Sequence, residues 1–87
     1  MPCYIISYDL RNERDYSALY EAIKGYGTWA HITESTWAVV ADERAAEVRD
    51  DLLQHMDDDD ALFVVKSGVA AAWRNVLCKD TWLRHNL

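Results

Sequence analysis

The chain has no long apolar run, few cysteines and no cluster of basic residues. No stretch is long enough to cross a membrane, and the N-terminus enters a strand pattern without a visible signal peptide. The two cysteines, Cys3 and Cys78, have neither metal-ligand spacing nor a disulfide framework, and we expect Cys3 to be a small buried hydrophobe. These absences favour a cytoplasmic protein.

Positive charge is also sparse. The 87 residues carry a net charge of −6, and the nine basic residues are scattered along the chain. This composition repels a phosphate backbone on average and argues against a broad nucleic-acid-binding surface. It does not exclude nucleic acid, because basic residues can act locally against the overall charge. It is compatible with an acidic protein that engages a basic partner.

What the sequence has in abundance is apolar and aromatic surface. Hydrophobic residues make up 51% of the chain, which includes four tryptophans and five tyrosines. A chain of this size forms one domain, residues 1–87, and buries only about 60–65% of its unfolded surface. The aromatic and apolar side chains of this sequence present more surface than a small monomer easily buries, so we expect a homodimer to cover the excess.

The first quarter of the chain predicts a strand and a helix. Residues 3–9 are apolar or aromatic on both faces, which is typical of a central strand covered on two sides. A helix with one apolar face follows over residues 16–23, with Asp15 as its N-cap. Gly25 and Gly27 end this helix.

The next elements are a hairpin, a second helix and a fourth strand. Residues 28–33 and 36–41 are rich in β-favouring side chains and predict an antiparallel hairpin. Residues 43–56 predict a helix with an apolar stripe, capped by Asp42. Residues 61–65 form a short apolar run of strand length.

The resulting order is β-α-β-β-α-β, with a core of residues 1–66 and a C-terminal extension of residues 67–87. This order matches the ferredoxin-like arrangement, a four-stranded antiparallel sheet with two helices on one face. In the extension, residues 70–74 favour helix, and Asp80 can cap a last helical turn.

Asp9 stands at the exit of the predicted central strand. A carboxylate at this place is rigidly held and meets solvent, which suits a metal ion or a substrate. The alternative is an aspartate that simply turns the chain at the start of a loop.

Three short segments of the first forty residues resemble a known family. They are the strand end Tyr8-Asp9-Leu10, the helix end Gly25-Tyr26-Gly27 and the hairpin segment Ser35-Thr36-Trp37. Together they resemble the Cas2 family of CRISPR-associated proteins and the related virulence-associated D toxins. The resemblance implies a ferredoxin-like homodimer in which Asp9 is the catalytic metal ligand and meets its twin from the second chain. The pair would hold a divalent cation, Mg²⁺ or Mn²⁺, for phosphodiester hydrolysis of RNA or DNA.

The sequence also departs from this family. Many relatives carry an arginine and a glutamine before the serine of the hairpin, where this chain has residues 29–33. The same dimer therefore also fits a non-enzymatic interaction module, acting as a scaffold or as an acidic regulator or inhibitor of a nucleic-acid-handling defence complex. The net charge favours the module, and the placement of Asp9 favours the nuclease.

Two arginines follow Asp9 closely. Arg11 and Arg14 could bind a phosphate beside the metal, or they could form ion pairs with Glu13 and Asp15.

The hairpin supplies two further expected substrate contacts, His31 and Ser35. His31 could act as a general acid or phosphate donor if its strand neighbours the strand of Asp9. The alternative is a partly exposed strand histidine.

The remaining candidates are an acidic run and the tryptophans. Residues 57–60 are four aspartates without calcium-loop spacing, so we expect a solvated turn. The tryptophans could stack on bases, but four aromatics buried in a small dimeric core are the simpler interpretation. We assign Trp37 and Trp73 to dimer or partner contacts.

Overall fold

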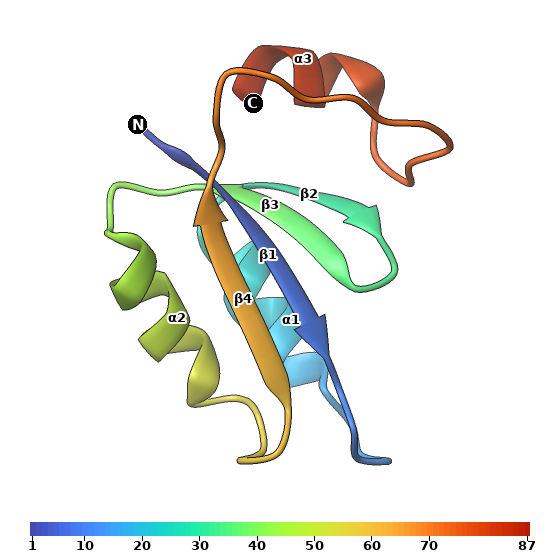
Figure 1. Cartoon of the computed structure of the whole chain (residues 1–87). Coiled ribbons are helices and arrows are strands. Elements are labelled where there is room, and N and C mark those ends of the chain that lie inside the picture. Colours follow the sequence, from blue (N-terminus) through green and yellow to red (C-terminus); the bar gives the residue numbers. More distant parts are fainter.

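A computed structural model describes all residues from Met1 to Leu87 as a small α+β fold with a four-stranded antiparallel sheet. The sheet order is β2-β3-β1-β4, so β1 is central and β2 and β4 are the edges (Figure 1). The strands are β1 (Cys3–Asp9), β2 (Thr28–Thr33), β3 (Thr36–Val40) and β4 (Ala61–Lys66). All four predicted strands are therefore confirmed, with shifts of one residue at the ends of β3 and β4.

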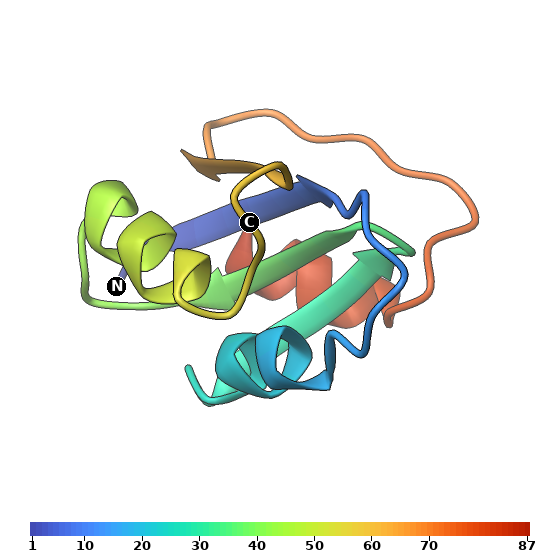
Figure 2. The ribbon, with the colours of Figure 1, turned by 90° about the horizontal axis from the view of Figure 1, so that it is seen from below.

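Two helices pack on one side of the sheet. Helix α1 (Ser17–Lys24) buries Leu19 and Ile23, and α2 (Ala45–Leu53) buries Val48 and Leu52. Figure 2 shows both helices along one side of the sheet, while the chain after β4 passes over the other side. The helical periodicity of the sequence therefore located the side of each helix that faces the core.

Both helices begin later in the sequence than the residue that was expected to cap them. Asp15 was expected to be the N-cap of α1, but Tyr16 holds that position; the Asp15 carboxylate, one residue earlier, accepts a hydrogen bond of 2.9 Å from the backbone N–H of Ser17. Asp42 was the wrong choice for α2, which begins three residues later. There the Glu47 carboxylate accepts a 2.9 Å bond from the backbone N–H of Arg44, so an acidic side chain within the first turn satisfies the helix start instead.

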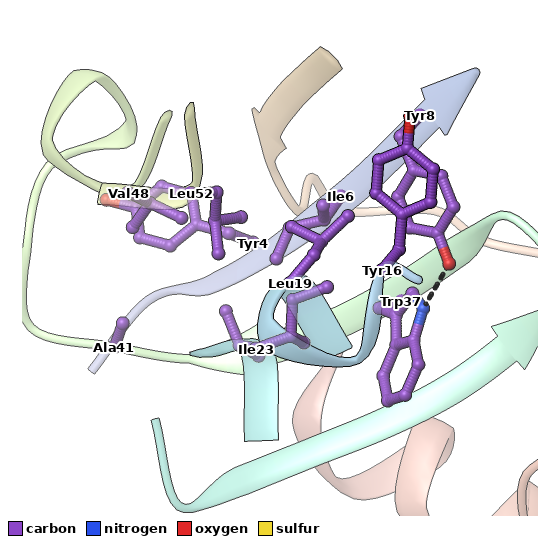
Figure 3. Packing of buried hydrophobic residues seen from close by; sticks show 11 residues of the cluster. Tyr4, Ile6, Tyr8, Tyr16, Leu19, Ile23, Trp37, Ala41, Val48 and Leu52 are labelled. Atoms are coloured by element: carbon purple, nitrogen blue, oxygen red, sulfur yellow. Dashed lines mark hydrogen bonds between the residues drawn. The ribbon is translucent and has the colours of Figure 1, made fainter. Parts of the chain in front are cut away.

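The core lies between the sheet and these two helices. It combines the even-numbered side chains of β1 with Trp37, Val39 and the buried faces of α1 and α2 (Figure 3). Within it, the indole N–H of Trp37 donates a 2.9 Å hydrogen bond to the hydroxyl of Tyr8 (Figure 3). A buried indole needs such a partner, because an unpaired buried N–H is costly.

The C-terminal extension differs from its prediction. Residues 70–74 form no helix, and the helix α3 is confined to Asp80–Asn86. The alanines of residues 70–72 are exposed, so a helix there would bury no apolar face and would be too short to be stable alone. Helix α3 lies beyond the end of the sheet where β1 begins and β4 ends (Figure 1).

The second face of the sheet is only partly covered by this extension. Leu83 of α3 is 1% exposed, and the backbone N–H of Leu77 donates to the carbonyl of Ile32 at 2.8 Å. Farther along β1 and β4 the same face is open, with Phe63 61% and Val65 42% exposed. We call this open part the uncovered strip, which comprises Ile5, Ser7, Asp9, Ala61, Phe63 and Val65. The prediction that β1 is covered on both sides thus holds only for part of its length within one chain.

No helix of the structure has the length and apolar character that a bilayer crossing requires.

Candidate functional site

Asp9 is the last residue of β1, and it points into solvent. Strand pairing sets it opposite Ala61 of β4, and its side chain is 71% exposed. The only charged partner is Arg11, whose Nε lies 3.5 Å from the carboxylate. A shallow hollow of about 190 Å³ surrounds this place and includes Ser7 and Phe63. Asp9 is therefore an exposed carboxylate at the end of the uncovered strip, with Arg11 as its one charged partner.

One chain does not assemble a metal site around this carboxylate. No group of three or more acidic, histidine or cysteine side chains in the structure is arranged so that it could hold a metal ion. Next to Asp9 stands a guanidinium, which competes with a cation for the same oxygen atoms. The residues of a single chain therefore do not fit Mg²⁺ or Mn²⁺, and a second carboxylate must come from another molecule if an ion is bound here.

The two loop arginines have separate partners, and neither is one of the partners named from the sequence. Arg11 turns back to Asp9, whereas Arg14 pairs with Asp57 and lies 4.9 Å from the ring centroid of Tyr16. Only Arg11 is therefore close to the candidate carboxylate. Arg14 belongs to the contact between the loop and the acidic run.

The acidic run forms hydrogen bonds with the loop between β1 and α1. We call residues 57–60 the aspartate turn. Asn12 donates hydrogen bonds of 2.9 Å to Asp57 and 2.7 Å to Asp59. Asp60 accepts bonds of 2.8 Å from the backbone N–H of Arg11 and of 2.8 Å from the hydroxyl of Tyr16. The turn expected from the sequence is present, but it binds the loop that follows Asp9 rather than facing only water.

These bonds shift the acidity of Asp60. Burial alone raises its pKa, but the backbone N–H groups of Arg11 and Asp57 and the hydroxyl of Tyr16 outweigh that effect. The pKa of Asp60 therefore lies below its ordinary value. Asp60 remains charged in the folded protein, and its charge holds the loop beside Asp9.

His31 and Ser35 occupy different places relative to Asp9. Strand β3 separates the strand of His31 from β1, so the condition for a His31–Asp9 pair is not met. His31 stacks on Trp37 with 3.9 Å between ring centroids, on the face of the sheet that bears α1 and α2. Ser35 lies nearer to Asp9, because its carbonyl accepts a 3.1 Å bond from the backbone N–H of Tyr8.

The two tryptophans assigned to partner contacts are engaged within the chain. Trp37 is only 3% exposed and has no surface to offer a partner, because it fills the core beside Tyr8. Trp73 is half-buried in the extension, and its indole N–H donates a 2.8 Å bond to Asp80. Burial of all four tryptophans was also expected, but in the single chain only Trp37 is buried.

Sequence reasoning missed the residue that stands beside Asp9 on the uncovered strip, Phe63. The apolar run of residues 61–65 was interpreted only as a strand, so its two faces were not distinguished. The pairing of Phe63 with Ser7 places it on the open face, while Leu62 and Val64 face the core. Side chains of a strand alternate between its two faces, but the continuous apolar run of β4 carries no signal of which face is open, so only the sheet pairing separates them.

A comparison of the sequence with known protein families finds no matching family.

Proposed function

We propose that this chain is a Cas2-like protein with a ferredoxin-like fold, which acts as a homodimer and cleaves RNA or DNA with a divalent cation. The β-α-β-β-α-β order and a central β1 between β3 and β4 support the ferredoxin-like part of the proposal. The segments that end in Leu10, Gly27 and Trp37 support the Cas2-like part. Both cysteines are free, which fits a cytoplasmic location.

The observation that carries the proposal is that Asp9 shares a sheet face with exposed apolar side chains. Phe63 and Val65 are large apolar groups in contact with water, and a second copy packed on the uncovered strip would remove them from it. A two-fold axis relates identical residues across such an interface. An axis that passes close to the end of β1 would therefore bring the two Asp9 carboxylates together.

In this dimer the two Asp9 carboxylates would hold Mg²⁺ or Mn²⁺, a role that one chain alone does not fulfil. The cation would supply charge stabilisation for phosphodiester cleavage. Arg11, already beside Asp9, would contact the phosphate, and Ser35 would line the same end of the sheet. His31 is placed outside this site by its position on the opposite face.

The test is cleavage of labelled single-stranded RNA, single-stranded DNA and duplex DNA by wild type and by Asp9→Asn. The side chain is exposed, so the variant should keep its circular dichroism spectrum and its dimeric mass. We expect wild-type cleavage to need Mg²⁺ or Mn²⁺ and to fall by at least about a hundredfold in Asp9→Asn. Asp58→Asn, which also removes one exposed carboxylate, should cleave like wild type. Cleavage that survives in Asp9→Asn would rule out the site.

A second candidate function is a non-enzymatic dimeric module that serves as scaffold or acidic regulator of a nucleic-acid-handling complex. It is favoured by the net charge of −6 and by the Arg11 guanidinium that lies 3.5 Å from the Asp9 carboxylate. For the module we expect no cleavage by the wild-type dimer and unchanged partner binding in Asp9→Asn. Substitutions in the exposed aromatic or acidic surface would abolish that binding.

A further inference from the structure

A larger hollow lies between β2 and the C-terminal extension, outside the proposed Asp9 site. Its volume is about 440 Å³, which is within the range of small-molecule sites. Its walls come from β2 and β3, from the end of α1 and from residues 77–82. We call it the tail pocket, and the lining side chains used below are Lys24, Trp29, Trp37, Lys79 and Trp82.

The tail pocket is rich in aromatic rings. Three of the four tryptophans of the chain line it. The ring of Trp29 lies 5.5 Å from that of Trp37 between centroids, and Trp29 is 37% exposed although it is a large apolar side chain. The rings of Trp29 and Trp82, unlike that of the buried Trp37, offer faces on which a planar aromatic ligand can stack.

Two indole N–H groups of this pocket, those of Trp29 and Trp82, have no hydrogen-bond partner in the chain. The indole N–H groups of the other two tryptophans, Trp37 and Trp73, donate to Tyr8 and Asp80. Trp29 and Trp82 make no hydrogen bond of this kind within the chain, and both line the tail pocket. A ligand with acceptor atoms in its ring system would satisfy them.

The charge of the tail pocket opposes the charge of the whole molecule. Lys24 and Lys79 line it and no carboxylate does, although the chain has 15 acidic residues and a net charge of −6. The ammonium of Lys24 lies 5.4 Å from the centroid of the Trp29 ring. Its one acidic partner is the exposed Glu21 at 3.7 Å, a pair that is weak in water.

We propose that the tail pocket binds a mononucleotide, with the base on Trp29 and Trp82 and the phosphate between Lys24 and Lys79. Stacking on aromatic side chains suits any base, because every base has a π face. Ammonium groups are strong partners for a phosphate group. Together the rings and the two cations match a ligand that is planar at one end and anionic at the other. This site is separate from Asp9 and does not require the proposed cleavage activity.

The first test is calorimetric titration of the full chain with adenosine 5′-monophosphate at low salt, where exposed charges are least screened. We expect binding, and we expect the Lys24→Gln/Lys79→Gln double variant to lose about tenfold or more in affinity. Both lysines are exposed, so the double variant should fold. Lys66→Gln on β4 removes the remaining lysine and is the matched control, with unchanged affinity expected. Adenosine and inorganic phosphate, which each carry one half of the ligand, should bind much more weakly.

The second test follows the indole N–H signals by nuclear magnetic resonance. Addition of the mononucleotide should shift the signals of Trp29 and Trp82 and leave that of Trp73 in place, because Trp73 does not line the tail pocket. Absence of binding at millimolar nucleotide would overturn the proposal, as would equal affinity in the double lysine variant. Binding of a single-stranded oligonucleotide without binding of the mononucleotide would also overturn it. Asp9→Asn should bind the mononucleotide like wild type. The absence of cleavage therefore leaves the proposal for the tail pocket standing, and the absence of mononucleotide binding leaves the proposal for Asp9 standing.

Discussion

Asp60 is the single residue on which the conformation of the β1–α1 loop depends most. It accepts hydrogen bonds from Arg11, from Tyr16 and from the backbone of Asp57, and these keep its pKa below the ordinary value. A carboxylate with a lowered pKa stabilises the folded state above its unfolded pKa, which is about 3.9. That contribution is lost as the pH falls through the lower pKa of the folded protein. The loop that carries Arg11 should therefore loosen in acid.

Asp60→Asn tests this role. The variant keeps the shape of the side chain but removes its charge, so we expect a lower urea midpoint than wild type at about pH 7. The difference should be smaller at an acidic pH below the unfolded pKa of about 3.9, because the wild-type contribution is lost as the pH falls toward the lower pKa of the folded protein. The control is Asp58→Asn, because Asp58 is exposed in the same aspartate turn, and its midpoint should follow wild type at both pH values. Equal effects of the two substitutions would contradict the specific role of Asp60.

Residue positions on one strand were predictable from the sequence, but contacts between distant segments were not. Asp9 was placed at a strand end because the apolar pattern stops there. The bonds from Asn12 and Tyr16 to the aspartate turn join segments more than 40 residues apart in the sequence, and no local pattern signals them. The separation of His31 from Asp9 follows from the insertion of β3 between their strands, which only the sheet order reveals.

At the scale of elements, the strands were predictable from short runs of apolar or β-favouring residues, and the first two helices from the period of their apolar residues. The extension after β4 lacks such a period, and local propensity misled there. Its alanines favour helix, yet residues 70–74 are irregular and helix forms only where Leu83 can be buried. Burial against the rest of the molecule, rather than propensity, decides where this short helix lies.

Leu83→Ala tests whether α3 is docked as described. Leu83 is 1% exposed, so its truncation should leave a cavity and lower the free energy of unfolding by about 2–4 kcal/mol, measured by urea denaturation. Leu77→Ala is the control, since Leu77 is 65% exposed in the same extension, and the expected change is below about 0.5 kcal/mol. A neutral Leu83→Ala would mean that α3 does not pack against the protein in solution.

At the scale of the whole molecule, the main feature is a sheet whose second face is only partly covered by the C-terminal extension. The helices fill one side, and the extension protects part of the other. Phe63 and Val65 expose large apolar surface on the uncovered strip, whereas Trp37, assigned to the dimer from the sequence, is buried. Large apolar side chains are also exposed elsewhere on the molecule, at Leu53, Val69 and Leu77. The sequence gives the amount of excess apolar surface, but its location depends on which face the extension reaches.

Phe63→Arg should therefore break the proposed dimer without unfolding the chain. Phe63 is 61% exposed, so a long charged side chain fits there in a monomer but would face its own copy across a two-fold axis. We expect wild type to have the mass of two chains in light scattering at micromolar concentration, and Phe63→Arg that of one. Leu53→Arg, at an exposed apolar position on α2, should remain dimeric. A monomeric wild type would contradict the dimer itself.

The most direct test of the central claim is a crystal structure of the full chain grown with Mg²⁺, in which the two Asp9 carboxylates are located. The account predicts a two-fold dimer through the uncovered strip, with an ion bound by both carboxylates at oxygen distances of about 2.0–2.1 Å. A dimer in which the two Asp9 side chains lie too far apart for one ion to bridge, or point to opposite sides, would contradict it.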